Sequence, residues 1–339
     1  MHRIPLTLDA PSTIPSAWFD RNRPARVPGI LGAPPYKAVA ARSMDRSGMA
    51  GYRLSVVVPA WNEEKAIALL LGDLRRQSLP ETEYEIIVVD GGSTDSTVPL
   101  MRALAATMPT LRIATNPKRW SSAGRNLGAA LSSAPFLLFV DAHCRISSRS
   151  MLADVLAAFE DGAQCVSRPQ PLVPSDERAL SRSIAATRST AVAHVPGSMI
   201  FRQEACWADP SSAGCGYSRQ LFSSLDGFDE SFDACEDVDF NLRVRDRGIA
   251  ARHSPRFAVS YFARATWRDL ARQMYRYGVG RGRLARKRGR LDPAAAYVPA
   301  LLVGLFALSG ASAFVCPHSA LVALPAMAAL IVAALVSAF

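Results

Sequence analysis

Asp141 and His143 form the sharpest pair of residues in this sequence that could do chemistry. They lie two positions apart after an apolar run, and side chains two apart in an extended segment point the same way. A carboxylate beside an imidazole makes half of a site for Mg²⁺ or Mn²⁺, and diphosphate oxygens would complete the shell. An ordinary hydrogen-bonded Asp–His pair is the alternative.

A second acidic group, Asp90 and Asp95, follows another apolar run and encloses Gly91 and Gly92. Asp90 could accept hydrogen bonds from a base or a ribose, while the glycines let the backbone come close to a ligand. A capped turn, in which Asp90 and Asp95 only accept from backbone N–H groups, is an equally good interpretation.

A third acidic group, Glu236, Asp237 and Asp239, opens a helical pattern that runs through Arg247 and is closed by Gly248. Acids in the first turn of a helix are common because they complement the helix dipole. A functional interpretation requires one of them to face a pocket as a general base.

The elements that must position these residues alternate between two patterns from residue 54 to residue 140. Short apolar, β-branched runs predict strands at Leu54–Val58, Glu85–Val89, Leu111–Thr115 and Phe136–Val140. Helical patterns separate them at Ala66–Leu74, Val98–Ala106 and Ser122–Leu131. This alternation predicts an α/β fold with a largely parallel sheet, whose ligand-binding residues follow the carboxyl ends of the strands. That rule selects Pro59–Glu64, Asp90–Ser96 and Asp141–His143.

The C-terminal third is basic and then apolar. Thr266–Asp269 is a capping box that opens a helix carrying Gln273 and Arg276 on one face. Arg276 could bind a diphosphate or belong to a basic, membrane-facing helix. The segment Arg281–Arg290 holds six cationic residues and no acid. We therefore expect residues 266–296 to form an amphipathic, basic, membrane-proximal segment.

Two charge-free apolar runs, Tyr297–Cys316 and Ser319–Phe339, end the sequence. Each is long enough to cross a bilayer core of roughly 30 Å, so residues 297–339 are predicted to form two transmembrane helices. A buried hairpin is the alternative. The basic block before the first run places the catalytic domain in the cytoplasm, at the inner or plasma membrane.

Composition narrows the choice of partner less than the motifs do. The 339 residues carry 39 Lys and Arg against 29 Asp and Glu, a net charge of +10. Such a surplus suits binding to nucleic acid, to an anionic membrane or to a phosphorylated substrate.

Residues 1–51 are rich in proline and arginine without periodicity, which predicts a flexible N-terminal extension. The six cysteines show no metal-type spacing, and we interpret them as reduced thiols.

The order and spacing of these motifs resemble family 2 glycosyltransferases. The segments that carry the resemblance are Val58–Glu64, Val89–Asp95, Ala123–Gly128, Phe139–His143, Gly227–Glu230 and Glu236–Asp239. The resemblance implies a GT-A fold, Rossmann-like with helices on both sides of the sheet, over residues 52–265. The Asp-Ala-His triplet is also similar to that of bacterial succinoglycan-type exopolysaccharide enzymes.

The resemblance implies a role for each matching residue. Asp90 would contact the nucleotide base, Asp141 and His143 stand at the metal-binding position, and Asp237 stands at the position of the catalytic base. Gln273 and Arg276 resemble a QxxRW element, although Tyr277 replaces its tryptophan. The expected donor-binding set is Pro59, Ala60, Glu63, Asp90, Gly92, Arg125, Asp141, Gln273 and Arg276.

The implied reaction is an inverting transfer from a nucleotide-diphosphate sugar, with a UDP-sugar favoured, to a hydroxyl of a lipid-linked glycan. Such a reaction belongs to exopolysaccharide or cell-envelope biosynthesis. A sugar-nucleotidyltransferase is one alternative, but it would need a Gly-rich, Arg-containing loop where Pro59–Glu64 stands. A non-enzymatic protein that binds membrane surfaces or nucleic acid is another, and it leaves the ordered acidic motifs unexplained. We therefore expect no nucleic-acid partner.

Overall fold

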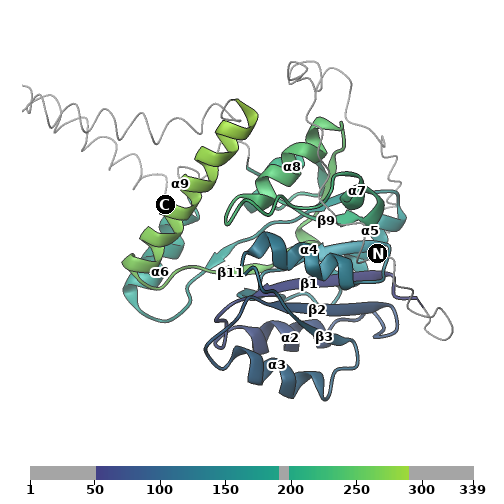
Figure 1. The fold of residues 1–339 in the computed structure, drawn as a ribbon, viewed down its shortest axis with the longest axis horizontal. Helices are drawn as coiled ribbons and strands as arrows, with labels where there is room; N and C mark the ends of the chain where they lie inside the picture. The colour runs from purple at the N-terminus through teal and green to yellow at the C-terminus, as the bar shows by residue number, and fades with distance from the viewer. Residues whose placement is uncertain (1–50, 191–197, 290–339) are drawn as a thin grey trace, which may run out of the picture.

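The structure, a computed structural model, describes residues 51–190 and 198–289 (Figure 1). The predicted extension, except for Gly51, and the two predicted transmembrane runs lie outside these residues. Within the described ranges, no helix is both long enough and apolar enough to span a bilayer.

The main sheet has eight strands in the order β3-β2-β1-β4-β9-β6-β10-β8. Its first half is parallel and consists of β1 (Leu54–Ala60), β2 (Tyr84–Asp90), β3 (Leu111–Thr115) and β4 (Phe136–Phe139). The second half consists of β6 (Cys165–Ser167), β8 (Cys206–Ala208), β9 (Gly214–Ser218) and β10 (Ala251–His253). β9 runs antiparallel to both β4 and β6, whereas β6 and β10 are parallel. The sheet is therefore mixed and mostly parallel, as the predicted fold class requires.

Helices cover both faces of this sheet (Figure 1). One face is covered by α2 (Ile67–Arg75), α3 (Thr97–Ala105) and α5 (Met151–Glu160), and the other by α4 (Ser121–Leu131), α7 (Arg219–Ser224) and α8 (Glu236–Asp246). Each face of the sheet packs against its helices in a hydrophobic core. Consecutive residues of β1 belong to different cores, because side chains alternate along a strand. Val56 and Val58 belong to the first core and Val57 to the second.

A small second sheet and three single turns complete the described fold. The sheet has the order β5-β11-β7, with β5 (Cys144–Arg145), β7 (Leu172–Val173) and β11 (Ser260–Phe262). The turns are 3₁₀ helices at Met199–Phe201, Pro210–Ser212 and Pro255–Phe257. No strand was predicted here from the sequence, because strands of two or three residues are too short to show a period.

Two further helices, α6 (Ala179–Arg188) and α9 (Trp267–Arg288), stand beside the sheets (Figure 1). The predicted capping box is confirmed, because Thr266 Oγ1 accepts a hydrogen bond from Asp269 N at 3.1 Å. The helix continues through the basic run to Arg288, and Gly289 follows it with φ of 70°.

Candidate active site

Two neighbouring cavities open where the parallel strands end. The β1 cavity, of roughly 550 Å³, is lined by Pro59, Ala60 and Glu63 after strand β1. The α8 cavity, of roughly 320 Å³, lies toward the second half of the sheet and is lined by Asp237 from α8. The residues that line both are Ser121, Asp141, His143, Arg264, Gln273 and Arg276. The predicted acid–imidazole pair therefore stands at the boundary between the two spaces.

Reciprocal hydrogen bonds fix the loop after β1 against the loop after β2. Asn62 N donates to Ser93 Oγ at 2.9 Å, and Thr94 N donates back to Asn62 Oδ1 at 2.8 Å. Ser96 N in turn donates to Glu64 Oε2 at 3.1 Å. Asn62 adopts a left-handed backbone with φ of 54° to make these contacts. The Ser-Thr-rich turn thus serves as the scaffold of the β1 cavity.

Asp90 is engaged inside its own turn. Its carboxylate accepts hydrogen bonds from Gly92 N at 3.0 Å and from Ser93 N at 3.2 Å. Asp90 is buried, and neither Asp90 nor Gly92 lines the two cavities, although Gly91 does. The geometry favours the capped-turn interpretation, and the contact between Asp90 and a base stays a prediction.

Asp141 and His143 lie in a turn and not in the extended segment that the sequence suggested. Strand β4 ends at Phe139, and Asp141 O accepts a hydrogen bond from Cys144 N at 3.1 Å. Both side chains nevertheless reach the boundary of the cavities. His143 Nδ1 lies 2.8 Å from Glu63 Oε1, and the edge of its ring meets Tyr261. The predicted pair is brought together, with Glu63 as a third member.

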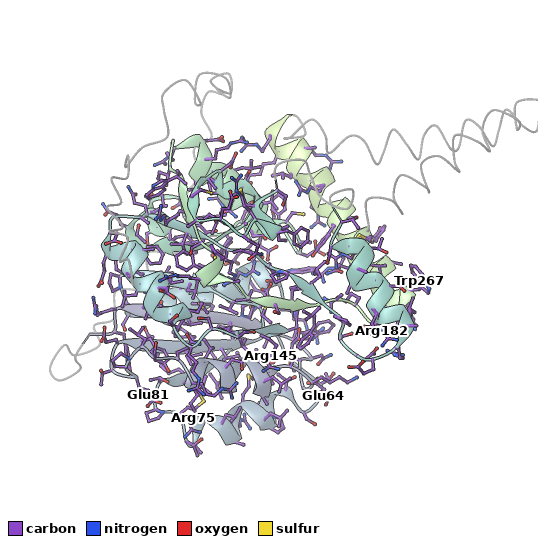
Figure 2. The ribbon with its side chains drawn as sticks, turned by 180° about the vertical axis from the view of Figure 1, so that it is seen from behind. Glu64, Arg75, Glu81, Arg145, Arg182 and Trp267 are labelled. Carbon is purple, nitrogen blue, oxygen red and sulfur yellow. The ribbon has the colours of Figure 1, made fainter. Side chains whose placement is uncertain are left out.

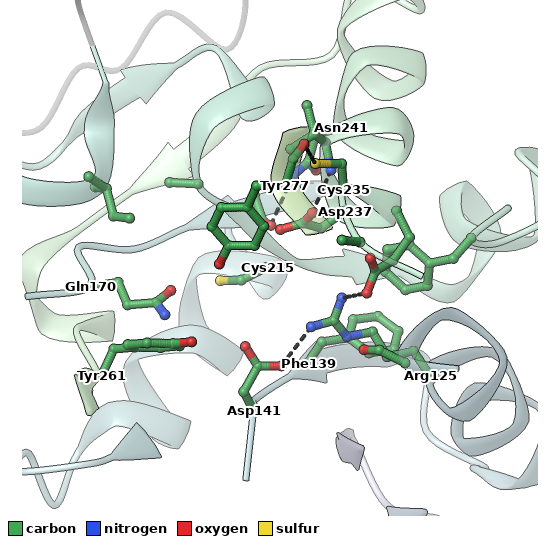
Figure 3. Close-up of a pocket in the computed structure, with 18 of the residues that line it drawn as sticks. Arg125, Phe139, Asp141, Gln170, Cys215, Cys235, Asp237, Asn241, Tyr261 and Tyr277 are labelled. Carbon is green, nitrogen blue, oxygen red and sulfur yellow. Dashed lines mark hydrogen bonds and ion pairs between the residues drawn. The ribbon is translucent and has the colours of Figure 1, made fainter. Parts of the chain in front are cut away.

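Arg125 bridges two of the acidic motifs, those of Asp141 and Glu236. Its Nη2 donates to Asp141 Oδ1 at 2.6 Å and its Nη1 to Glu236 Oε1 at 2.7 Å (Figure 3). Burial opposes ionisation of Asp141, but the charges of Arg125 and His143 outweigh it and lower its pKa to about 2. Burial raises the pKa of Glu236, and Arg125 offsets this only in part. Of the two cavities, Arg125 lines only the α8 cavity. The structure therefore shows it as an ion-pair bridge, and its predicted contact with the donor stays a prediction.

Only one of the three acids that open α8 remains available. Glu236 is buried against Arg125, and Asp239 is buried and paired with Arg243 at 2.9 Å and Lys287 at 2.9 Å. Asp237 is exposed to the α8 cavity, and its Oδ1 accepts a hydrogen bond from Val238 N at 2.8 Å. Among the described residues, the Asp237 carboxylate forms no ion pair. It can therefore accept a proton from a ligand.

Helix α9 supplies Gln273 and Arg276 to both cavities, as their spacing predicted. Gln273 is buried, and its Nε2 donates to the hydroxyls of Tyr261 at 3.1 Å and Tyr277 at 3.2 Å. Arg276 Nη2 donates to the backbone oxygen of Asp233 at 2.6 Å, and its side chain stays half-exposed. Gln273 thus fixes the cavity wall, while Arg276 presents a cation at its rim.

Several residues that line the two cavities were not predicted from the sequence. Asn116, Arg119 and Trp120 follow strand β3 and line the β1 cavity. The rule that selected the residues after the other three parallel strands would also have found these. Arg168 and Arg264 line the α8 cavity from the irregular second half, where the pattern gave no means of placing them.

The residues at the boundary fit a divalent cation that takes its remaining ligands from a diphosphate. No set of three or more His, Cys, Asp or Glu side chains in the described part of the chain could hold a metal alone. His143 Nε2, however, is buried without a hydrogen-bond partner among the described residues, while Glu63 orients the ring through Nδ1. A histidine held in this way by a carboxylate is typical of metal ligands. Asp141 supplies an ionised oxygen beside it.

Comparison with known proteins relates this geometry to an enzyme family. A Methanococcus voltae protein named dolichyl N-acetyl-alpha-D-glucosaminyl phosphate 3-beta-D-2,3-diacetamido-2,3-dideoxy-beta-D-glucuronosyltransferase is 24% identical, over 69% of this chain and 74% of that protein. The succinoglycan biosynthesis protein ExoA of Rhizobium meliloti is 26% identical, over 67% of this chain and 68% of that protein.

Similarity to a solved structure supports the same fold. A mannosyltransferase from Pyrobaculum calidifontis, solved with GDP-Man and Mn²⁺, has a TM-score of 0.59 at 22% identity, and the match covers 84% of this chain and 85% of that one. The sequence profile named glycosyl transferase family 2 matches residues 55–224, and the one named glycosyl transferase family group 2 matches residues 149–338. Since the first of these spans half of the chain, the protein belongs to glycosyl transferase family 2 and is a glycosyltransferase that uses a nucleotide sugar.

Proposed function

We propose that this glycosyltransferase inverts the anomeric centre as it moves a sugar from a UDP-sugar to a hydroxyl of a lipid-linked glycan at the membrane. The observation that carries the proposal is the unpaired Asp237 carboxylate, which shares one cavity with Asp141 and His143 (Figure 3). A proton acceptor and a site for a leaving diphosphate are the two requirements of a single displacement. Family membership removes the nucleotidyltransferase and non-enzymatic alternatives.

The two cavities divide the substrates in this proposal. The nucleotide lies in the β1 cavity between Trp61 and Trp120, and the sugar extends past Asp141 into the α8 cavity. Arg264 and Arg276 face the diphosphate at the boundary. A bound Mg²⁺ or Mn²⁺, held by Asp141 and His143, would neutralise charge on the diphosphate.

Asp237 acts on the acceptor in the proposed reaction. As the acceptor oxygen bonds to the anomeric carbon, its proton passes to the Asp237 carboxylate, and the bond from that carbon to the diphosphate oxygen breaks. The attack comes from the face opposite the leaving group, so an α-linked donor gives a β-linked product. Arg125 keeps the neighbouring Glu236 in a buried ion pair, which leaves Asp237 as the base.

The outer face of α9 supports attachment to a membrane. Trp267 and Tyr275 are 67% and 74% exposed, and Met274 is exposed near them. Trp267 projects from the edge of the molecule in Figure 2. Exposed Arg268 lies beside this aromatic face, and exposed Arg272, which also lines the β1 cavity, follows one helical turn later. Aromatic rings flanked by arginines suit the headgroup layer of an anionic membrane.

A lipid-linked acceptor and a cytoplasmic catalytic domain at the inner or plasma membrane complete the proposal. The Methanococcus relative is named for a dolichyl-linked acceptor, and the Rhizobium relative for succinoglycan biosynthesis. The first name supports a lipid-linked acceptor, and the second supports a role in exopolysaccharide biosynthesis. The cytoplasmic side is proposed because the basic segment Arg281–Arg290 precedes the first predicted span.

The test is a donor screen with the purified full chain. We expect release of UDP from at least one UDP-sugar in the presence of Mn²⁺ or Mg²⁺, and loss of that release in excess EDTA. NMR of the product formed on a lipid-linked acceptor should show an inverted anomeric centre. Undiminished activity in excess EDTA, or retention of configuration, would contradict the proposal.

A further inference from the structure

Arg168 is a buried cation that lacks a counterion in the described structure. It directly follows strand β6 and is only 5% exposed. Its Nη2 donates to Phe139 O at 3.0 Å, which fixes the direction of the guanidinium group. Its Nε and Nη1 are buried with no hydrogen-bond partner, and no carboxylate in the described ranges pairs with it. Burial of an unpaired charge is costly, so this arrangement requires an explanation.

Arg219 shows how the same fold satisfies a half-buried arginine that has a structural role. Its Nε donates to Ala134 O at 2.7 Å and its Nη1 to Ala129 O at 2.8 Å. Its Nη2 donates to Ser132 Oγ at 2.7 Å. All three nitrogens of Arg219 are therefore used, whereas two of the three in Arg168 are not.

The position of Arg168 indicates which part of the substrates it meets. It lines the α8 cavity together with Gln170, Cys215 and Asp237, and it does not line the β1 cavity. Figure 3 shows Gln170 on the side of the cavity opposite Arg125. Since the diphosphate belongs at the boundary between the cavities, Arg168 faces the transferred sugar or the acceptor.

Asp141, an acid on which the charge of Arg168 acts, is already engaged. Arg168 is among the groups that lower the pKa of Asp141, but Asp141 Oδ1 bonds to Arg125 at 2.6 Å and the two residues form no ion pair. The Nε and Nη1 groups of Arg168 thus remain without a partner among the described residues, in a side chain that lines the α8 cavity. Guanidinium groups bind carboxylate and phosphate oxygens best.

We propose that Arg168 binds an oxyanion carried by one of the two sugars in the α8 cavity. The two sources are a uronate carboxylate on the transferred sugar and a carboxylate on the acceptor sugar. The inference rests on the proposed function and deepens it, because it makes the enzyme selective for a charged substrate. A neutral sugar would leave the Arg168 charge buried and unpaired, which is the basis of strong discrimination.

The stability of the full chain tests the site without any turnover. Arg168→Met removes an unpaired buried charge, so its melting temperature should equal or exceed that of the wild type. Arg219→Met, the matched control, should melt at a lower temperature because it removes three hydrogen bonds. Sodium glucuronate should raise the melting temperature of the wild type and of Arg219→Met more than glucose does, and this difference should vanish in Arg168→Met. An Arg168→Met protein that keeps the glucuronate effect would overturn the proposal.

Kinetics distinguish the two sources of the oxyanion. In the donor arm, Arg168→Gln should raise the KM for UDP-glucuronate by about 10- to 100-fold relative to its effect on UDP-glucose. In the acceptor arm, Arg168→Gln should raise the KM for octyl glucuronide selectively, relative to its effect on the KM for octyl glucoside. A selective loss in either arm identifies the source, and equal effects on charged and neutral partners in both arms overturn the proposal. If no donor is turned over, the proposed function fails, while the melting experiment still decides the Arg168 site.

Discussion

At the scale of the residue, His143 is oriented by a group that stands 80 positions earlier in the chain. Glu63 Oε1 contacts Nδ1 of the imidazole, which leaves Nε2 as the ring nitrogen without a partner among the described residues. Glu63 is therefore a positioning residue for the proposed cation in addition to a wall of the β1 cavity.

Glu63→Gln should weaken the response to Mn²⁺ by about 10- to 100-fold, because the amide lacks the charge that strengthens the imidazole as a ligand. The measurement is the Mn²⁺ concentration for half-maximal release of UDP. Glu64→Gln is the matched control, since Glu64 bonds to Ser96 N and does not contact His143. Equal Mn²⁺ requirements in both variants would show that Glu63 has no such role.

Much of the site could be predicted from the rule that ligand-binding residues lie after parallel strands. The contacts between the side chains of these residues could not be predicted. Pro59, Ala60 and Glu63 stand where that rule placed them. The contact of Arg125 with Glu236 joins residues 111 positions apart, which no local pattern reveals. The unsatisfied nitrogens of Arg168 likewise become visible only when burial is known.

At the scale of the element, long buried strands were predictable and short ones were not. β1 and β2 are seven residues each and nearly fully buried, so they appear in the sequence as continuous apolar runs. β5 and β7 have two residues each, and the contacts that create them lie far away in the chain. Tertiary pairing determines such strands.

Helix α9 holds the start of α8 in place through close packing at Gly280. A Cβ atom added there would lie 2.6 Å from Ala234 O and 2.9 Å from Cys235 Sγ. Gly280→Ala should therefore cost about 1–3 kcal/mol of stability and reduce transfer, because it displaces the turn that carries Asp237. Thermal melting and a transfer assay would measure the two effects.

Gly282→Ala is the matched control on the same helix. An added Cβ there meets nothing within 4 Å, so alanine should stabilise the helix by up to about 1 kcal/mol. If Gly280→Ala and Gly282→Ala behaved alike, the close packing of α9 on α8 would not be what holds the base.

At the scale of the whole molecule, the two cavities and the outer face of α9 belong to one body. Helix α9 lines both cavities with Gln273 and Arg276, while Trp267 and Tyr275 point away from the sheet core. Binding of this face to lipid would bring the α8 cavity close to a lipid-linked acceptor. The predicted spans at residues 297–339 lie outside the described structure. Within that structure, the outer face of α9 is the feature that supports attachment to a membrane.

Full-length proteins that keep a single tryptophan can test this attachment. In liposomes that contain anionic lipid brominated near the headgroup, Trp267 fluorescence should be quenched several-fold more than that of Trp120. Trp120 is the control because it is 48% exposed but lines the β1 cavity. Equal quenching of both residues would mean that this face of α9 does not lie on the membrane.

The proposed reaction depends most on Asp237 as the base that acts on the acceptor. Asp237→Asn keeps the shape of the side chain and cannot accept the proton. Glu236 and Asp239 are poor controls, because each is buried in an ion pair and its replacement would disturb the fold. Binding of the UDP-sugar by the same variant serves as the control instead.

The most direct measurement compares donor binding with transfer in Asp237→Asn and in the wild type, using the full chain, Mn²⁺ and a lipid-linked acceptor. We predict that the dissociation constant of the UDP-sugar stays within a few-fold, while the rate of transfer falls by about 10²- to 10⁴-fold or more. Transfer at the wild-type rate by Asp237→Asn would contradict the account, because the base would then lie elsewhere.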